Sequence, residues 1–194
     1  GPAPSAEAIA ATDARVQAAE SAAAASVAEA EKATIKSAQA LVLSQVSTAL
    51  VSGVAFSDLL AGLDASIPEA LSSVAETGVP TITALQTSFP AAARHALDAA
   101  LRADTGEGSI DRATILLTTQ TGARSLTPRE GNDPDAILSR AEAALTAGDL
   151  PNALAELAAL PNAAQVPMAE WQALARKRVA ATQAFAEFSA SLSQ

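Results

Sequence analysis

Helical periodicity in the last third of the chain is the feature that most limits the possible folds. Between Asp133 and Leu192, apolar residues recur at three- and four-residue steps, and start and stop residues divide the segment. Asp133 followed by Pro134 is typical of a helix start, because the carboxylate accepts hydrogen bonds from free N–H groups and proline needs no donor in the first turn. Gly148 predicts a left-handed stop and Asp149 a new start. The first half of this segment is therefore predicted to be a helical hairpin.

The hairpin is expected to bury one face of each helix. The apolar residues on these faces are Ile137, Ala141, Ala144 and Leu145 in the first helix and Leu150, Leu154, Leu157 and Ala158 in the second. Leu160-Pro161-Asn162 is predicted to end the hairpin.

A long final helix is predicted to begin near Pro167. Along it runs a line of residues at three- and four-residue steps, which we call the seam: Trp171, Leu174, Arg178, Ala181, Phe185, Phe188 and Leu192. A seven-residue repeat of this kind is typical of helices that pack on other helices. We therefore expect the seam to form a helix–helix or oligomer interface, although Arg178 stands where an apolar residue is expected. Trp171 is interpreted as a core or interface anchor rather than a ligand platform.

The N-terminal part of the chain is predicted to be one long helix. Residues 3–34 are mostly Ala, Glu and Ser, and the larger apolar residues Ile9, Val16 and Val27 match no continuous heptad. This part is interpreted as a solvated helix or as the weak end of a coiled coil, and Gly1-Pro2 as a protease-cleavage scar. From Ile35 onwards apolar residues become denser and predict a buried face: Leu41, Val42, Val46, Leu50 and Val54. We therefore divide the chain into an Ala-rich helix, residues 1–37, and a helical domain, residues 38–194.

Proline and glycine divide the middle of the chain into short helices. Gly53 is expected to loosen the chain, and Ser57 to cap a short helix that carries Leu59, Leu60 and Leu63. A second short helix is predicted from Pro68 to Glu76, with Gly78 as its stop.

After the turn at Val79-Pro80-Thr81, Ser88 and Pro90 predict a fresh start and a separate helix from Phe89 to Arg102. Its inner face would hold Ala93, Ala96, Leu97, Ala100 and Leu101, while Arg94, Asp98 and Arg102 line the outside.

Residues 110–119 favour strand locally, but a lone strand would have no partner, so they are interpreted as helix. Residues 120–132 are interpreted as a mobile loop. Since no alternating strand pattern occurs anywhere, the predicted class is all-α: a long N-terminal helix, then a bundle of short helices with a C-terminal helical hairpin and a long final helix.

Composition excludes several classes of function. The 194 residues carry a net charge of -9, which argues against nucleic-acid binding because phosphate neutralisation needs a basic surface. Cysteine is absent, so disulfides and thiolate metal sites are excluded. No apolar run approaches the ~20 residues that span a bilayer. Aromatic residues make up only 3%, so a thin core that relies on helix–helix contacts, including contacts between subunits, is expected.

Enzymatic activity is not expected. The single histidine, His95, lies among alanines, and neither a phosphate-binding glycine loop nor a set of metal ligands at known spacings occurs. Acidic pairs such as Glu29 with Glu31, or Asp133 with Asp135, are better explained by solvation and helix capping. No catalytic, cofactor-binding or metal-binding residue is therefore predicted, and no cofactor.

Two cationic features stand out in this acidic chain. Arg176-Lys177-Arg178 is the densest cluster of positive charge. Arg178 either snorkels or pairs with Glu142 or Glu156 of the hairpin, or the cluster contacts an acidic partner or a lipid head group. The second feature is the segment 79–102, in which Phe89, Arg94 and Arg102 are candidate lipid contacts, because an apolar helix with basic flanks can lie on a membrane. The same pattern also fits a helix that packs into a core.

Several motifs resemble the mitofilin family in its alphaproteobacterial form. They are Gly78-Val79-Pro80-Thr81 with Leu85 and Phe89, Arg140-Ala141-Glu142 with Leu145, Gly148-Asp149-Leu150, Ala153-Leu154, Leu160-Pro161, Trp171 and Arg178. The resemblance covers roughly residues 38–194. One departure is the segment 118–124, where the short basic stretch often found in the family is missing.

The resemblance implies that the chain is the end of a coiled coil plus a C-terminal mitofilin domain. It further implies a soluble fragment of a protein anchored in the inner membrane and facing the periplasm. Such a protein would organise membrane invaginations or cristae-junction-like necks through self-association and peripheral contact with anionic phospholipid. Other periplasmic or outer-membrane proteins are further candidate partners.

Two alternatives stay open. The hairpin 141–160 is similar to a tetratricopeptide unit, which would indicate a soluble protein-interaction module, although no second copy occurs at a ~34-residue period. The chain is also similar to a haem-pathway membrane protein in its C-terminal helices, again without catalytic residues.

Overall fold

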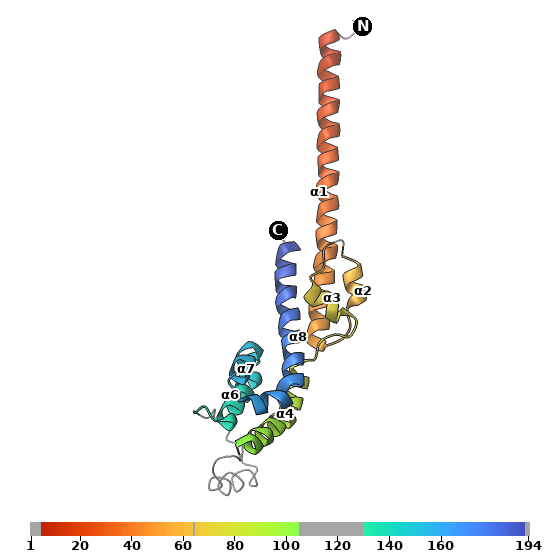
Figure 1. The fold of residues 1–194 in the computed structure, drawn as a ribbon. Helices are drawn as coiled ribbons and strands as arrows, with labels where there is room; N and C mark the ends of the chain where they lie inside the picture. Colours follow the sequence, from red (N-terminus) through yellow and green to blue (C-terminus); the bar gives the residue numbers. More distant parts are fainter. Residues whose placement is uncertain (1–4, 64, 105–129, 193–194) are drawn as a thin grey trace.

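The computed structural model describes residues 5–63, 65–104 and 130–192, and all regular structure within these ranges is helical (Figure 1). The predicted all-α class, with a long first and a long last helix, is confirmed. The helices are α1 (Ala6–Ser52), α2 (Ser57–Ala61), α3 (Glu69–Ala75), α4 (Ile82–Ala103), α6 (Pro134–Thr146), α7 (Leu150–Leu157) and α8 (Asn162–Leu192). The predictions for residues 110–119 and for most of 120–132 lie outside the described residues.

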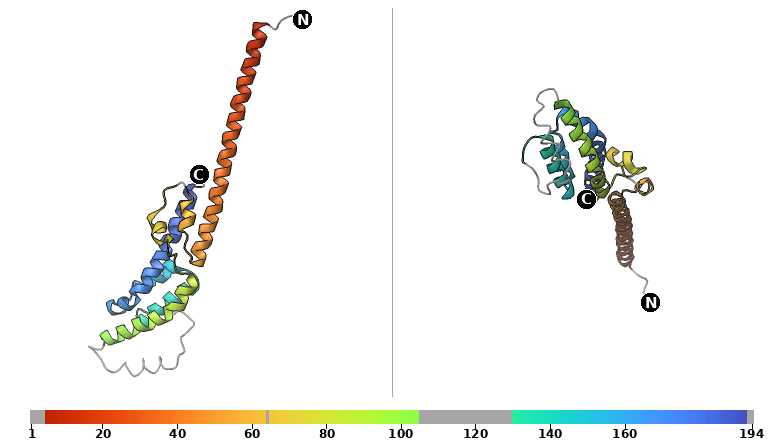
Figure 2. Two further views of the ribbon diagram at one scale, coloured as in Figure 1. Left: turned by 90° about the vertical axis from the view of Figure 1, so that its right-hand side faces the viewer. Right: turned by 90° about the horizontal axis from the view of Figure 1, so that it is seen from below.

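Helix α1 is a single rod that projects far beyond the rest of the molecule (Figures 1 and 2). Its 47 residues span about 70 Å at 1.5 Å per residue. Residues 5–38 are all exposed, and only Val46, Ala49 and Leu50 near its end are fully buried. The boundary drawn between residues 37 and 38 therefore falls inside one continuous helix, close to where contact with the remaining helices begins.

Two residues of the predicted buried face of α1 are exposed. Leu41 is 61% exposed because it lies five residues, or about 140° around the helix, from buried Val46. Val54 is 54% exposed because the helix has ended before it, at Gly53. Val42 is partly buried, while Val46 and Leu50 are buried as predicted.

The buried side chains form two cores, and α8 contributes to both. The first, which we call the α4 core, contains residues of α4, α6, α7 and the first half of α8, including Phe89, Ile137, Leu157 and Trp171. The second, which we call the α3 core, contains residues of the end of α1, α2, α3 and the second half of α8, including Val46, Phe56, Leu71 and Phe188. Along α8, Ala175 is the last buried residue of the α4 core and Ala181 the first of the α3 core.

Two prolines predicted to start new helices lie inside helices instead. Pro90 is within α4, so the separate helix from Phe89 to Arg102 is wrong. Proline removes one backbone hydrogen bond, but the buried face of α4 continues across it through Leu85, Phe89 and Ala93, and this packing outweighs the loss.

Pro167 is within α8, which begins at Asn162 rather than near Pro167. The carbonyl oxygen of Pro161 accepts hydrogen bonds from the N–H groups of Ala164 and Gln165, which starts the helix earlier. Buried Ala164 and Met168 then hold the turns on both sides of the proline in the α4 core.

The predicted hairpin is confirmed as α6 and α7. The Asp133 carboxylate accepts from the Ala136 N–H at 3.0 Å, and that of Asp149 accepts from the Asn152 N–H at 3.1 Å. Gly148 takes a φ of 81°, the left-handed stop that was expected. The predicted inner faces are buried except for Leu154, which is partly buried, and Ala158, which is exposed because α7 ends one residue before it.

The cap assigned to Ser57 is wrong. Phe56 occupies the N-cap position of α2 without a side-chain hydrogen bond, and Ser57 is the first helical residue. Burial of Phe56 in the α3 core fixes this start where the serine hydroxyl was expected to do so.

The end of α1 and the segment between α3 and α4 cross at two glycines. Gly53 and Gly78 both have positive φ, 76° and 74°. A Cβ atom on Gly78 would lie 2.3 Å from the carbonyl oxygen of Gly53, and one on Gly53 would lie 2.8 Å from that of Val79. Only glycine therefore allows the two backbones to come this close.

We expect Gly78→Ala to lower the free energy of unfolding well beyond the cost of the backbone conformation alone, because the new Cβ overlaps a backbone oxygen that cannot move independently. Gly148→Ala is the matched control, since Gly148 has a similar φ but a Cβ added there would meet no atom within 4 Å. The control should lose about 1–2 kcal/mol. Urea titration followed by circular dichroism at the helical minimum measures both. Equal losses in the two variants would show that the crossing is not tightly packed.

Candidate functional site

The predicted cationic cluster on α8 is divided between surface and interior. Arg176 and Lys177 are exposed, whereas Arg178 is partly buried between the two cores. Three consecutive residues on a helix point about 100° apart, so they cannot form one flat patch. Within the described ranges Arg176 and Lys177 form no ion pair, which leaves both charges to solvent or to a partner.

Arg178 binds two backbone carbonyls from segments far away in the sequence. Its Nη1 donates to the Leu50 carbonyl oxygen at 3.1 Å and to that of Pro80 at 2.9 Å. Both acceptors lack a helical donor. The Val54 N–H, which would reach Leu50 in a longer helix, bonds Ala49, and the Ala84 N–H bonds the Thr81 side chain. Arg178 therefore caps the negative end of α1 from another helix.

Burial lowers the pKa of the Arg178 guanidinium from its usual value, because desolvation disfavours the charged form. Arginine nevertheless stays protonated at neutral pH, so a full positive charge faces the carbonyl oxygens. Arg178 does not form the ion pair with Glu142 or Glu156 that was one interpretation of its position. Glu156 pairs with Arg140, whose Nε lies 2.9 Å from the carboxylate.

A chain of side-chain amides connects the exposed Arg176 to the end of α7. Arg176 Nη2 donates to Gln172 Oε1 at 2.7 Å, and Gln172 Nε2 donates to Gln165 Oε1 at 3.2 Å. Gln165 Nε2 in turn reaches the carbonyl oxygens of Leu157, Ala158 and Leu160. Leu157 is the last residue of α7 and also accepts from the Leu160 N–H, whereas the Ala158 and Leu160 carbonyls follow the helix and receive their donor from the glutamine.

Phe89 and Trp171 form the centre of the α4 core. Their ring centroids lie 5.0 Å apart at an interplanar angle of 76°, an edge-to-face contact, and the Trp171 Nε1–H donates to the Leu85 carbonyl oxygen at 3.0 Å. Phe89 is only 1% exposed, so in this conformation its side chain is not available to a bilayer. The segment 79–102 thus packs into a core, one of the two outcomes considered for it.

The seam of α8 packs within the same chain, with one shift in register. Leu174 is 38% exposed, and Ala175 takes its place in the α4 core. Ala181 and Phe188 are buried in the α3 core, and Phe185 and Leu192 pack partly buried against it. A step of four residues from Trp171 to Ala175 keeps the line facing inward where the predicted step of three does not.

Arg94 and Arg102 lie on the exposed outer side of α4, as predicted. They are not brought together with Arg176 and Lys177. Arg178 contacts Pro80 and Trp171 contacts Leu85, so the α8 cluster lies beside the first turn of α4. Arg94 is then about 18 Å further along that helix.

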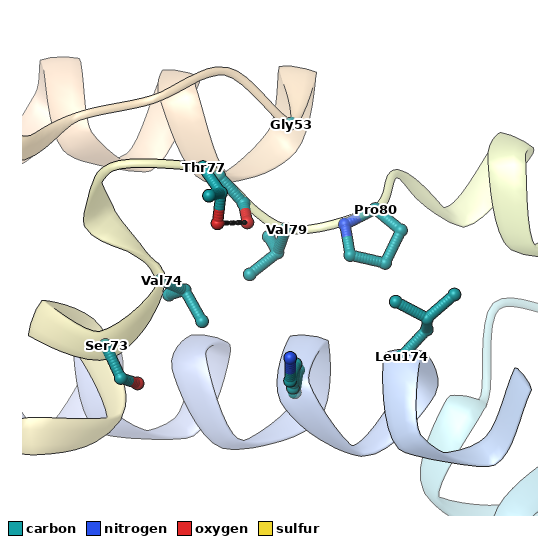
Figure 3. A pocket seen from close by; sticks show the side chains of 9 residues that line it. Gly53, Ser73, Val74, Thr77, Val79, Pro80 and Leu174 are labelled. Carbon is teal, nitrogen blue, oxygen red and sulfur yellow. Dashed lines mark hydrogen bonds between the residues drawn. The ribbon is translucent and has the colours of Figure 1, made fainter. Parts of the chain in front are cut away.

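A cavity of about 330 Å³ lies where α1, α3 and α8 meet (Figure 3). Its lining comes from Gly53, Ser73, Val74, Thr77, Gly78, Val79, Pro80, Leu174 and Lys177. The walls thus combine aliphatic and polar side chains, with Lys177 as the only charged member. The Thr77 hydroxyl donates to the Gly78 carbonyl oxygen at 3.3 Å.

Within the part of the chain that the structure describes, no group of three or more His, Asp and Glu side chains could hold a metal ion. His95 is exposed on α4, outside the enclosed setting in which a catalytic base is held against its partner. In the same ranges, no helix combines the length and apolar character needed to cross a bilayer.

Comparison of the chain with protein-family models, with curated proteins and with solved structures finds no match.

Sequence reasoning missed two glutamines of α8 whose side chains form the hydrogen-bonded chain to the end of α7. Gln165 and Gln172 were not singled out, although Gln165 follows the previous helix closely enough to reach the carbonyls at its end. A glutamine within one or two turns of a predicted helix end is the sequence signal that could have identified Gln165. The partners of Arg178 left no such signal, because Leu50 is 128 residues away.

Replacing Gln165 with leucine should lower the free energy of unfolding by about 1–2 kcal/mol, since the carbonyls at the end of α7 lose their donor. Gln183→Leu is the control, because the Gln183 amide bonds only the exposed Glu187 carboxylate; it should change stability by less than about 0.5 kcal/mol. Thermal and urea unfolding, followed by the fluorescence of the single tryptophan, compares the two. A Gln165 variant as stable as the Gln183 variant would contradict the capping role.

Proposed function

We propose that the chain is the helical end of a membrane-organising protein of mitofilin type. It would self-associate through α1 and touch anionic phospholipid through the exposed cations of α8. The resemblance in residues 38–194 supports this, and so do the exposed features of the fold. The observation that carries it furthest is the projecting α1, which is far longer than its own domain can cover. In this proposal the protein acts from the inner membrane on its periplasmic side and performs no chemistry.

Self-association is supported by one face of α1. On an ideal helix Ile9, Val16 and Val27 lie within about 20° of each other, and Leu41 within about 40°. All four are about half exposed or more. Val46, which contacts the α3 core, points about 100° away from this line, so the domain leaves it uncovered. A sparse apolar line among alanines permits close pairing of helices, with little area gained per turn.

The double variant Val16→Glu with Val27→Glu should shift the protein from an oligomer to the 19.4 kDa single chain in sedimentation experiments, because charges on this line cannot be buried at a helix–helix contact. Ala18→Glu with Ala25→Glu changes charge equally on the opposite face of α1 and should leave the oligomer intact. A native protein that sediments as a single chain at every concentration would contradict self-association.

Membrane contact is supported by Arg176 and Lys177. Both are exposed and lack a carboxylate partner within the described ranges, in a chain whose net charge is -9. Long-range attraction to an anionic surface therefore cannot come from the whole protein and must be local. Each basic residue close to an anionic bilayer contributes on the order of 1 kcal/mol.

Arg176→Gln with Lys177→Gln should weaken binding to vesicles that contain an anionic phospholipid by roughly 30-fold, the equivalent of about 2 kcal/mol. Lys32→Gln with Lys36→Gln removes the same charge from α1 and serves as the control, with little expected change. Vesicle flotation at low ionic strength measures both, and binding should fall as salt is added. If native protein does not float with such vesicles at low salt, the lipid part of the proposal is wrong.

A protein-interaction module is the alternative function. The α6–α7 hairpin supports it, since it forms as a tetratricopeptide unit would. Its inner face, however, packs against α4 and α8 in the α4 core, and no second hairpin of this kind occurs in the described ranges. Stacked repeats gain their stability from about three or more copies, so we favour the membrane-organising function.

A further inference from the structure

The position of Arg178 has a consequence for how α1 is held. The α4 core ends at Ala175 of α8 and the α3 core begins at Ala181, and Arg178 lies midway between them. At this level α8 carries no fully buried apolar side chain. The two cores therefore meet at a polar contact on α8, close to the backbone crossing of Gly53 and Gly78.

The two carbonyls that Arg178 binds belong to different parts of the fold. Leu50 is in the last turn of α1, and Pro80 is in the segment that leads into α4. One guanidinium thus connects α8, the end of α1 and the approach to α4. Both bonds have donor–acceptor distances of 3.1 Å or less, and a planar, always charged fork holds such acceptors at fixed angles.

Because α1 is long, its far end moves much further than its end at this contact when the helix rotates there. Residues 6–38 are all exposed, so about 50 Å of α1 extends beyond the helices that pack against its end. A rotation of about 10° at Leu50 then moves the N-terminal end by about 10 Å. A small rotation at the junction therefore displaces the N-terminal end of α1 by a large distance.

We propose that Arg178 is a positioning residue that fixes the direction of α1 relative to the α4 core. The bonds to Leu50 and Pro80 hold the angle between the two cores together with the Gly53–Gly78 crossing and the continuous α8. Burial of the guanidinium, which lowers its pKa, agrees with a charge held in place by the fold rather than left to solvent. This role is independent of lipid binding and of self-association.

Distances between spin labels test the proposal, and the absence of native cysteine makes specific labelling simple. Ala33→Cys on the exposed part of α1 and Ala147→Cys after α6 report the angle between rod and α4 core. Ala91→Cys with Ala147→Cys reports the α4 core itself. Labelled protein is diluted with unlabelled protein so that only distances within one chain are measured.

Native protein should give a single narrow distance between positions 33 and 147. Arg178→Met, which keeps the length of the side chain but cannot donate, should at least double the width of that distribution and leave the 91–147 distance unchanged. Arg178→Lys, which keeps the charge but not the planar fork, should give an intermediate width. Arg176→Met is the matched control and should match native protein.

A native distance and width in Arg178→Met would overturn the proposal. If Arg178→Met does not fold, as judged by its helical circular dichroism, Arg178→Gln is read in its place, because its shorter, neutral side chain cannot reach both carbonyls. A folded Arg178→Gln with the native width would then overturn the proposal equally.

Discussion

The contact of the Arg178 guanidinium with the carbonyl oxygens of Leu50 and Pro80 is the constraint around which the rest of the structure is arranged. Each carbonyl is left without a donor by local structure, one where α1 stops and one just before α4 starts. Gly53 and Gly78 let the two backbones cross closely enough for one side chain to reach both. Without a charge at this point of the seam, α8 would present an apolar surface to two backbone oxygens. Arg178 thus donates to two carbonyl oxygens that would otherwise lack a partner, and this accounts for a charged residue within the apolar seam.

Alanine determines how the cores on either side of this contact are built. Ala93, Ala96, Ala141 and Ala153 are almost completely buried, so the helices of the α4 core approach closely through small side chains. Such positions gain little area each, so the larger side chains of this core supply most of its apolar surface, among them Phe89, Leu157 and Trp171. Polar side chains satisfy backbone groups where helices end: Gln165 donates to three carbonyl oxygens and Arg178 to two.

Sequence reasoning succeeded where the signal is local. The caps at Asp133 and Asp149 and the left-handed Gly148 depend on interactions within four residues, and all three are confirmed. It was wrong where packing between segments distant in the sequence determines the helix boundary or the buried residue. Pro90 and Pro167 were predicted to start helices, but the buried faces of α4 and α8 continue across them. Leu174 was placed in the seam by periodicity, whereas the neighbouring helices select Ala175. The sequence shows that Arg178 stands at an apolar position of the seam. It does not show why, because the partners of Arg178 are brought to it only by the tertiary structure.

The same contact links the two features on which the proposed function depends. The apolar line of α1 is on a rod held only by its last turns, and the exposed cations Arg176 and Lys177 immediately precede the residue that holds it. If the rod pairs with another and the cations meet a membrane, the angle at Arg178 decides whether both contacts can form at once. The two hydrogen bonds of Arg178 set this angle together with the Gly53–Gly78 crossing and the buried end of α1. The fold therefore places Arg178, which binds the end of the long α1, directly after two exposed positive charges.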